Sequence, residues 1–133
     1  MNMTRAKSRS AWIAGLTSAI ALVAVLPHVV SSSSDDAREI HLVARDMTYY
    51  MDGQDVPNPT LHVRRGERIR IRLTNRDAGM SHDVGIRAWQ RGTGLIAGPG
   101  EAAVEFVAPQ ASGEETYACS PHGEMMRGTI RIE

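Results

Sequence analysis

The segment from residue 117 to residue 128 gathers residue types that bind soft metal ions. Cys119 and His122 are followed by two adjacent methionines, Met125 and Met126, so that a thiolate, an imidazole and a thioether fall within a few residues. Soft sulfur ligands combined with imidazole favour copper. Two His and one Cys in a trigonal set, with a weak axial Met, form the copper sites that transfer electrons. The spacing therefore predicts a copper site at the end of a strand.

Such a site needs a second histidine from another part of the chain, and His82 is the candidate. It follows a turn-forming stretch at residues 75–79 and has the same strand parity as Val84 and Ile86, which predicts that its side chain faces the core. A buried imidazole without a partner costs free energy, and a role as a ligand would remove that cost. The predicted ligands are thus His82, Cys119, His122 and one of the two methionines.

Each of these residues has a simpler interpretation when it is taken alone. A single buried Cys is usually an inert small hydrophobe, and methionines usually pack in a core. Here the Cys, His and Met follow one another at a strand end, and a further histidine lies on an upstream strand. It is less probable that all of them have only these simpler roles than that they bind one metal ion. Zinc is the rival metal, but structural zinc needs four strong ligands, and Glu124 would have to replace the methionine. Copper is favoured.

The elements that position these residues follow a β pattern from about residue 38 onward. Apolar residues recur at every second position, and Gly, Pro, Asn and Asp mark turns between the runs. No segment after Ser34 shows a helical period. Many short strands predict an antiparallel sandwich or barrel over residues 35–133. The predicted inward-facing residues are Ile40, Leu42, Ala44, Leu61, Val63, Ile69, Ile71, Leu73, His82, Val84, Ile86, Ala102, Val104, Phe106, Tyr117, Cys119, Ile130 and Ile132.

Five arginines, at positions 64, 65, 68, 70 and 72, follow one another closely in this region. They allow two interpretations: a docking patch for an acidic partner, or a solvated strand face that also discourages edge-to-edge pairing of sheets. The solvated face is the favoured interpretation.

The first 34 residues predict export. Arg5, Lys7 and Arg9 precede an apolar run over residues 11–26, which resumes briefly at residues 29–30 and ends in four serines. Residues 1–34 are either a cleaved signal peptide or a membrane anchor with a Ser-rich linker, in which residues 11–30 would span the membrane. Because the positive charges precede the apolar run, both alternatives place residues 35–133 outside the cytoplasm. The expected location is periplasmic or at the cell surface, secreted or membrane-anchored.

Composition narrows the possible partners. Basic and acidic residues are equal in number, at 15 each, and only 5% of residues are aromatic, so neither a basic patch nor a stacking platform for nucleic acid is expected. Cys119 is the only cysteine, which excludes an intramolecular disulfide. A lone thiol in an exported protein is a liability unless something such as a metal occupies it.

Several short motifs resemble the cupredoxin family, the small type 1 blue copper proteins such as plastocyanin, amicyanin and azurin. The resemblance spans roughly residues 38–133, and its motifs are Pro59-x-Leu61-x-Val63-x-x-Gly66-Glu67, Ser81-His82, Tyr117-x-Cys119-x-Pro121-His122 and Met126-x-Gly128-Thr129. It implies a Greek-key β-sandwich with one type 1 copper ion. His82, Cys119 and His122 would be equatorial ligands, with an axial methionine. The family's axial Met usually stands two residues before a Gly, which favours Met126; Met125, at the tighter amicyanin-like spacing, is the alternative.

The resemblance also implies a function. The protein would carry single electrons by Cu(II)/Cu(I) cycling between extracytoplasmic redox partners that bind transiently, and it would act as a monomer. His122 would lie near the surface within an apolar rim made of Gly79, Met80, Pro121, Gly123 and Met125. The alternative is an extracytoplasmic copper carrier or storage protein, since the methionines suit Cu(I). An enzyme is not expected, because a saturated site offers no open coordination position and the chain shows no acid–base pair.

One residue departs from the family pattern. The position after the first histidine is often Asn, which helps to tie two loops beside the cysteine, whereas this chain has Asp83. A carboxylate cannot donate the same hydrogen bond unless it is protonated. We therefore expect the hydrogen bonds around the ligands, and hence the reduction potential, to differ more than the ligand set itself.

Overall fold

The computed structural model describes residues 36–133, and these residues form an all-β fold as predicted. The predicted signal or anchor segment, residues 1–34, lies outside the described residues. Within residues 36–133 the only helical element is a single 3-10 turn, η1 (Arg87–Trp89). None of the helical structure in this part of the chain is long and apolar enough to cross a membrane.

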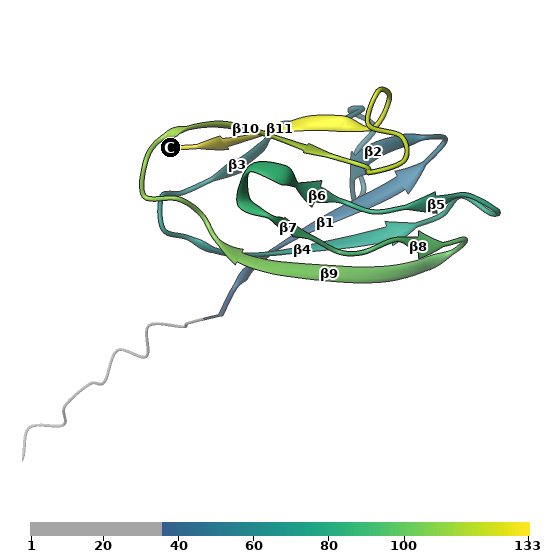
Figure 1. The fold of residues 1–133 in the computed structure, drawn as a ribbon, viewed down its shortest axis with the longest axis horizontal. Helices are drawn as coiled ribbons and strands as arrows, with labels where there is room; N and C mark the ends of the chain where they lie inside the picture. The colour runs from purple at the N-terminus through teal and green to yellow at the C-terminus, as the bar shows by residue number, and fades with distance from the viewer. Residues whose placement is uncertain (1–35) are drawn as a thin grey trace, which may run out of the picture. The chain divides into compact units, whose positions relative to one another are not determined.

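The strands form two larger sheets and one small pair (Figure 1). The first sheet has the order β2-β1-β4-β9, the second has the order β3-β11-β10-β6-β7, and β5 pairs with β8. Two pairings are parallel, β1 with β4 and β3 with β11, and the others are antiparallel. The strands are β1 (Arg38–Arg45), β2 (Thr48–Met51), β3 (Leu61–Val63), β4 (Arg68–Asn75), β5 (Ser81–His82), β6 (Gly85–Ile86), β7 (Arg91–Gly92), β8 (Ile96–Ala97), β9 (Gly100–Val107), β10 (Gly113–Ala118) and β11 (Arg127–Ile132).

One core lies between the two sheets, and the period-2 pattern identified most of it. In β4, Ile69, Ile71 and Leu73 are fully buried while the intervening arginines point outward. The same cluster takes Leu61 from β3 and Ile130 from β11, so both sheets contribute to it. Burial of these side chains is the main favourable term in folding the domain.

The arginines of β4 are neutralised by neighbouring carboxylates. Arg70 Nη1 lies 2.8 Å from Glu105 Oε1 on β9, and Arg72 pairs with Glu39 on β1. Arg38 at the start of β1 similarly pairs with Glu67, at 2.6 Å. Exposed pairs of this kind add little stability. Their presence supports the interpretation of this face as a solvated strand surface instead of a free basic patch.

A hairpin that the sequence analysis did not predict joins β1 to β2. Asp46 and Met47 form its two-residue turn, and both have positive φ, at 51° and 57°. Positive φ at both central residues is typical of a type I′ turn, which usually contains Asn or Gly. The hairpin brings Tyr49 into the core, where it is fully buried. It also places the two turn amides close to the end of the sandwich at which β5 and the loop after β10 meet (Figure 1).

The pairing of Gly128 with Tyr117 generates a test of the packing. A Cβ atom at Gly128 would lie 2.3 Å from the Tyr117 ring, and this ring is fully buried with its hydroxyl donating to the Pro59 carbonyl at 2.6 Å. The ring has no room to move, so we expect Gly128→Ala to lower the free energy of unfolding by about 1–3 kcal/mol, measured by denaturant titration.

The matched control is Gly113→Ala, on the partner strand. Nothing lies within 4 Å of a Cβ atom there. We expect a change within about 0.5 kcal/mol. Equal unfolding midpoints for the two variants would contradict the packing argument.

Candidate metal centre

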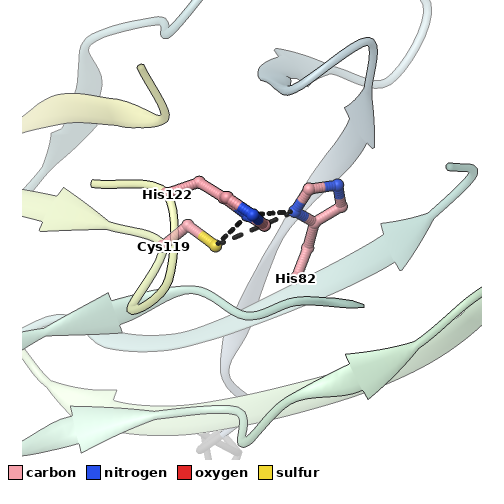
Figure 2. Close-up of side chains that lie close together, drawn as sticks. All are labelled: His82, Cys119 and His122. Carbon is pink, nitrogen blue, oxygen red and sulfur yellow. Dashed lines mark hydrogen bonds between the residues drawn. The ribbon is translucent and has the colours of Figure 1, made fainter. Parts of the chain in front are cut away.

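Three of the predicted ligands, which come from two separate segments of the chain, converge in space. His122 Nδ1 lies 3.3 Å from His82 Nδ1, and the Cys119 sulfur lies 3.8 Å and 3.6 Å from the Nδ1 atoms of His82 and His122 (Figure 2). His82 and Cys119 are buried, whereas His122 is only partly buried. In the described part of the chain, these three residues form the one group of His, Cys, Asp and Glu side chains placed to hold a metal ion.

The loop between β10 and β11 carries two of the three side chains and is closed by its own backbone. The Cys119 amide donates to the Met126 carbonyl at 3.0 Å, and the Met125 and Met126 amides both donate to the His122 carbonyl. A loop with these internal bonds cannot change length without breaking them. Cys119 and His122 therefore point to the same side because the loop is a compact turn.

The two methionines at the end of this loop have different environments. Met126 is fully buried, immediately before β11, while the Met125 side chain is 54% exposed. The Met125 carbonyl accepts a hydrogen bond from Asn58 Nδ2 at 2.8 Å, which ties this part of the loop to the turn between β2 and β3. Only the Met126 side chain thus lies in the interior near the metal-ligand loop.

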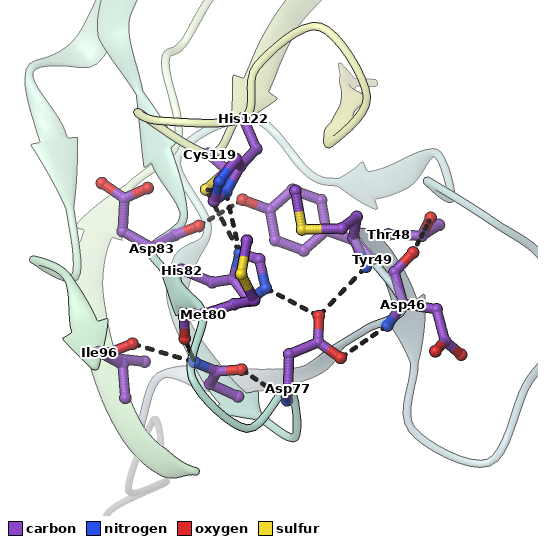
Figure 3. Close-up of polar contacts among 12 residues, drawn as sticks. Asp46, Thr48, Tyr49, Asp77, Met80, His82, Asp83, Ile96, Cys119 and His122 are labelled. Atoms are coloured by element: carbon purple, nitrogen blue, oxygen red, sulfur yellow. Dashed lines mark hydrogen bonds and ion pairs between the residues drawn. The ribbon is translucent and has the colours of Figure 1, made fainter. Parts of the chain in front are cut away.

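A carboxylate that the sequence analysis did not single out holds His82. The His82 Nε2 atom lies 2.8 Å from Asp77 Oδ2, and the two Asp77 oxygens also accept hydrogen bonds from the amides of Asp46 and Met47 at 2.7 and 3.1 Å (Figure 3). Partial burial alone would favour the protonated acid, but the two amides and the imidazole together lower the pKa of Asp77. An ionised carboxylate only accepts, so His82 Nε2 carries the proton and Nδ1 presents its lone pair to the site.

Asp83 keeps the two loops together in a way that the sequence analysis did not foresee. Its carboxylate accepts two hydrogen bonds from Ser120, from the amide and from the hydroxyl, each at 2.6 Å. The tie between the His82 and Cys119 segments is therefore present, with Asp83 as the acceptor. The buried hydroxyl of Tyr49 donates a hydrogen bond to the Asp83 carbonyl and fixes the same segment from the core side.

Cys119 is 1% exposed. Burial raises its pKa, although the amides of Asp83 and His122 act in the opposite direction. The metal-free thiol is therefore protonated at neutral pH and a poor nucleophile. A metal ion that binds it must displace the proton, so that metal affinity depends on pH.

The donor atoms fit a first-row metal ion in size and in chemistry. An ion about 2.0 Å from each nitrogen and about 2.3 Å from sulfur, at the centre of a triangle, separates its donors by roughly 3.5–3.7 Å. The observed edges, 3.3 to 3.8 Å, are close to this. Glu124, which the zinc alternative requires, is exposed and is not one of the converging residues in the described part of the chain. The donor set therefore suits copper better than structural zinc.

Comparison with known proteins agrees with this chemistry. A family model described as copper binding proteins, plastocyanin/azurin family, matches residues 14–133. A search of curated proteins by sequence gives no match.

Several solved structures share the fold. Auracyanin A, titled a "blue" copper protein from Chloroflexus aurantiacus, is 16% identical with a TM-score of 0.55, and the match covers 74% of this chain and 100% of that one. A reduced auracyanin from Roseiflexus castenholzii is 15% identical with a TM-score of 0.58, covering 73% and 98%. Reduced rusticyanin is 18% identical with a TM-score of 0.52, covering 74% and 81%. At these identities the likeness concerns the fold, and it supports the predicted cupredoxin-like β architecture.

The family model covers most of the chain, including both segments that carry the converging residues. The thiol of Cys119 and the imidazoles of His82 and His122 lie close enough together to bind one copper ion. This chain belongs to the plastocyanin/azurin family of copper binding proteins, as the cupredoxin resemblance implied.

Proposed function

We propose that the protein carries single electrons between redox proteins outside the cytoplasm, using one type 1 copper ion. The observation that carries this proposal is the buried triangle of one thiol sulfur and two imidazole nitrogens, of which only His122 reaches toward the surface. His82, Cys119 and His122 are the proposed equatorial ligands. When bound there, copper supplies a one-electron Cu(II)/Cu(I) couple.

Met126 is the proposed axial ligand. Its side chain is fully buried, and its backbone is hydrogen-bonded to Cys119 and to His122. The buried side chain of Met126 therefore starts from a backbone position next to both ligands. Met125 has the opposite character, with more than half of its side chain in solvent. With four protein donors the site would have no open position for a substrate, which supports a carrier over an enzyme.

The residues around the ligands would hold the donor atoms in place in either oxidation state of a bound copper ion. Asp77 fixes the tautomer and the ring orientation of His82, and Asp83 locks the Cys119 loop through Ser120. Asn75 donates to the carbonyls of Met80 and Ile96, which secures the strand that bears His82. Because these contacts join groups of the protein to one another, little rearrangement would be needed when a bound copper ion changes its oxidation state.

His122 provides the exit toward a partner. Met80 and Met125 are 37% and 54% exposed, and Pro121 beside the histidine is also exposed. An exposed apolar rim of this kind suits brief docking of a redox protein. We expect the protein to be a monomer outside the cytoplasm, periplasmic or at the cell surface. Residues 1–34 would be either a cleaved signal peptide or a membrane anchor, with residues 11–30 in the membrane.

A second candidate function is copper delivery or storage. The exposed thioethers of Met80 and Met125 favour it, because they could accept Cu(I) on its way to or from His122. The two functions differ in whether the bound ion cycles between Cu(II) and Cu(I).

Colour tests the main proposal. We expect the copper-loaded protein to be intensely coloured through its thiolate–Cu(II) bond, and Cys119→Ser to lose that absorption completely. The matched control is His62→Ala, which removes an exposed imidazole paired with Glu133 at the opposite end of the sandwich, and it should keep the colour. A wild-type protein that binds only Cu(I) and stays colourless under oxidising conditions would support the delivery or storage function.

Potentiometry tests the axial assignment. We expect Met126→Leu to keep copper and to raise the reduction potential, since the loss of a thioether donor destabilises Cu(II) more than Cu(I). The neighbouring substitution Met125→Leu should leave the potential unchanged. The reverse result would assign the axial position to Met125.

Metal affinity tests the role of Asp77. We expect Asp77→Asn to weaken Cu(II) binding roughly 10–100-fold in a competition titration. The reduction potential should rise, because the negative charge that favours the more positive ion is lost. Asp46→Asn removes an equal charge from an exposed carboxyl in the adjacent turn and should change neither quantity appreciably. Equal effects of the two substitutions would show that charge alone, without the hydrogen bond, explains the result.

A further inference from the structure

Asn58, in the loop between β2 and β3, has a backbone conformation that its neighbours in the chain disfavour. Its φ is 46°, in the left-handed region, and it stands between Pro57 and Pro59. A residue before proline prefers an extended conformation, and residues other than glycine seldom adopt positive φ. Such a conformation persists only where the surrounding structure holds it. The folded domain must therefore hold Asn58 through specific contacts.

Three hydrogen bonds hold Asn58. Its backbone amide donates to the Tyr49 carbonyl at 2.8 Å, and its Oδ1 atom accepts from the Tyr49 amide at 3.2 Å. Because β2 lies at the edge of its sheet, these two bonds occupy that edge at Tyr49. The third bond leaves the strand, since Asn58 Nδ2 donates to the Met125 carbonyl at 2.8 Å. The side-chain amide thus acts as acceptor toward β2 and as donor toward Met125.

The metal-ligand loop, residues 119–126 between β10 and β11, is tied to the rest of the domain near both of its ends. Near its start, the amide and the hydroxyl of Ser120 donate to the Asp83 carboxylate. Near its end, the Met125 carbonyl accepts the hydrogen bond from Asn58. Met126 is the next residue, and its side chain is fully buried. The bond from Asn58 therefore fixes the backbone at the point from which the Met126 side chain starts.

Tyr49 extends the contacts of Asn58 to the segment that carries the other histidine. The Tyr49 hydroxyl donates to the carbonyl of Asp83, the residue after His82 (Figure 3). The Tyr49 backbone is in turn bonded to Asn58. Asn58 touches none of the three converging side chains, yet it is joined directly to the metal-ligand loop and through one residue to the His82 segment. It can therefore set the distance between the two.

We propose that Asn58 is a positioning residue of the copper site, which holds the metal-ligand loop where Met126 acts as the axial donor. The proposal rests on the electron-transfer function and on the axial assignment proposed above. The axial contact of such a site is long and weak, and it tunes the reduction potential. Because the bond itself is weak, its length depends on how the protein places the thioether. A displaced loop would therefore change the axial contact more than the equatorial ones.

The first test measures the reduction potential of Asn58→Gly in two backgrounds of the copper-loaded full-length protein. Glycine accepts positive φ, so the substitution removes both side-chain bonds without adding strain. In wild type we expect the potential to rise, in the same direction as in Met126→Leu but by less. In the Met126→Leu background the substitution should not change the potential, because no axial thioether is left to displace. An equal shift in both backgrounds, or no shift in wild type, would overturn the proposal.

The matched control is Gln54→Gly, which makes the same loop more flexible at an exposed residue. We expect its potential to equal that of wild type. A rise as large as in Asn58→Gly would mean that flexibility of the loop, without the bond to Met125, explains the effect, and would also overturn the proposal.

Hydrogen exchange of the metal-free protein tests the same contact without copper. Asn58→Asp keeps an acceptor for the Tyr49 amide and tolerates positive φ, but its carboxylate cannot donate to the Met125 carbonyl. We expect the amides of Cys119 and Met126 to exchange roughly tenfold faster than in wild type, while the amides of β4 keep their protection. Unchanged exchange at both loop amides would overturn the proposal. A wild-type protein without a Cu(II)/Cu(I) couple would refute the carrier function, and the exchange rates would still decide whether Asn58 holds the loop.

Discussion

The hydrogen bond from the His82 imidazole to the Asp77 carboxylate is the contact on which the site depends most. It joins a fully buried ring to a carboxylate that is itself held by the amides of Asp46 and Met47. Without it, burying the ring would leave Nε2 without a partner, at a cost of about 1–3 kcal/mol. With it, the hairpin turn between β1 and β2 determines which nitrogen of His82 faces Cys119. The geometry of the metal centre is therefore set partly by an element that contributes no ligand.

Asp83 provides a similar constraint on the other half of the site. Its carboxylate lies between the segment that bears His82 and the loop that bears Cys119. Each of its two oxygens accepts a hydrogen bond from Ser120, which orients the carboxylate toward the Cys119 loop. Tyr49 fixes the backbone of the same residue from the core. Negative charge thus lies close to the donors on two sides, which favours the more highly charged state of a bound cation.

Local patterns were enough to predict the strands that have one solvent-exposed face, and the inward-facing histidine on one of them. The alternation through Ile69, Ile71 and Leu73 gave the parity of β4, and the parity of His82 with Val84 placed the histidine inside. Periodicity says nothing about which turns meet in space. The strand that carries Tyr49 was missed because its turn lacks Gly and Asn, and the role of Asp77 was missed because its partners lie about 30 residues earlier.

The distribution of arginines shows how composition alone can mislead. Equal numbers of basic and acidic residues suggest a surface without directional charge, and the clustered arginines of residues 64–72 seemed the main exception. In the folded domain Arg70 and Arg72 of that cluster are paired with carboxylates that β9 and β1 place opposite them. Arg87, Arg91 and Arg127, which make no ion pair in the described part of the chain, lie far apart in sequence and meet through the pairing of β10 with β6 and β11 and of β6 with β7. The distribution of charge over the surface therefore depends on the strand topology as well as on the composition.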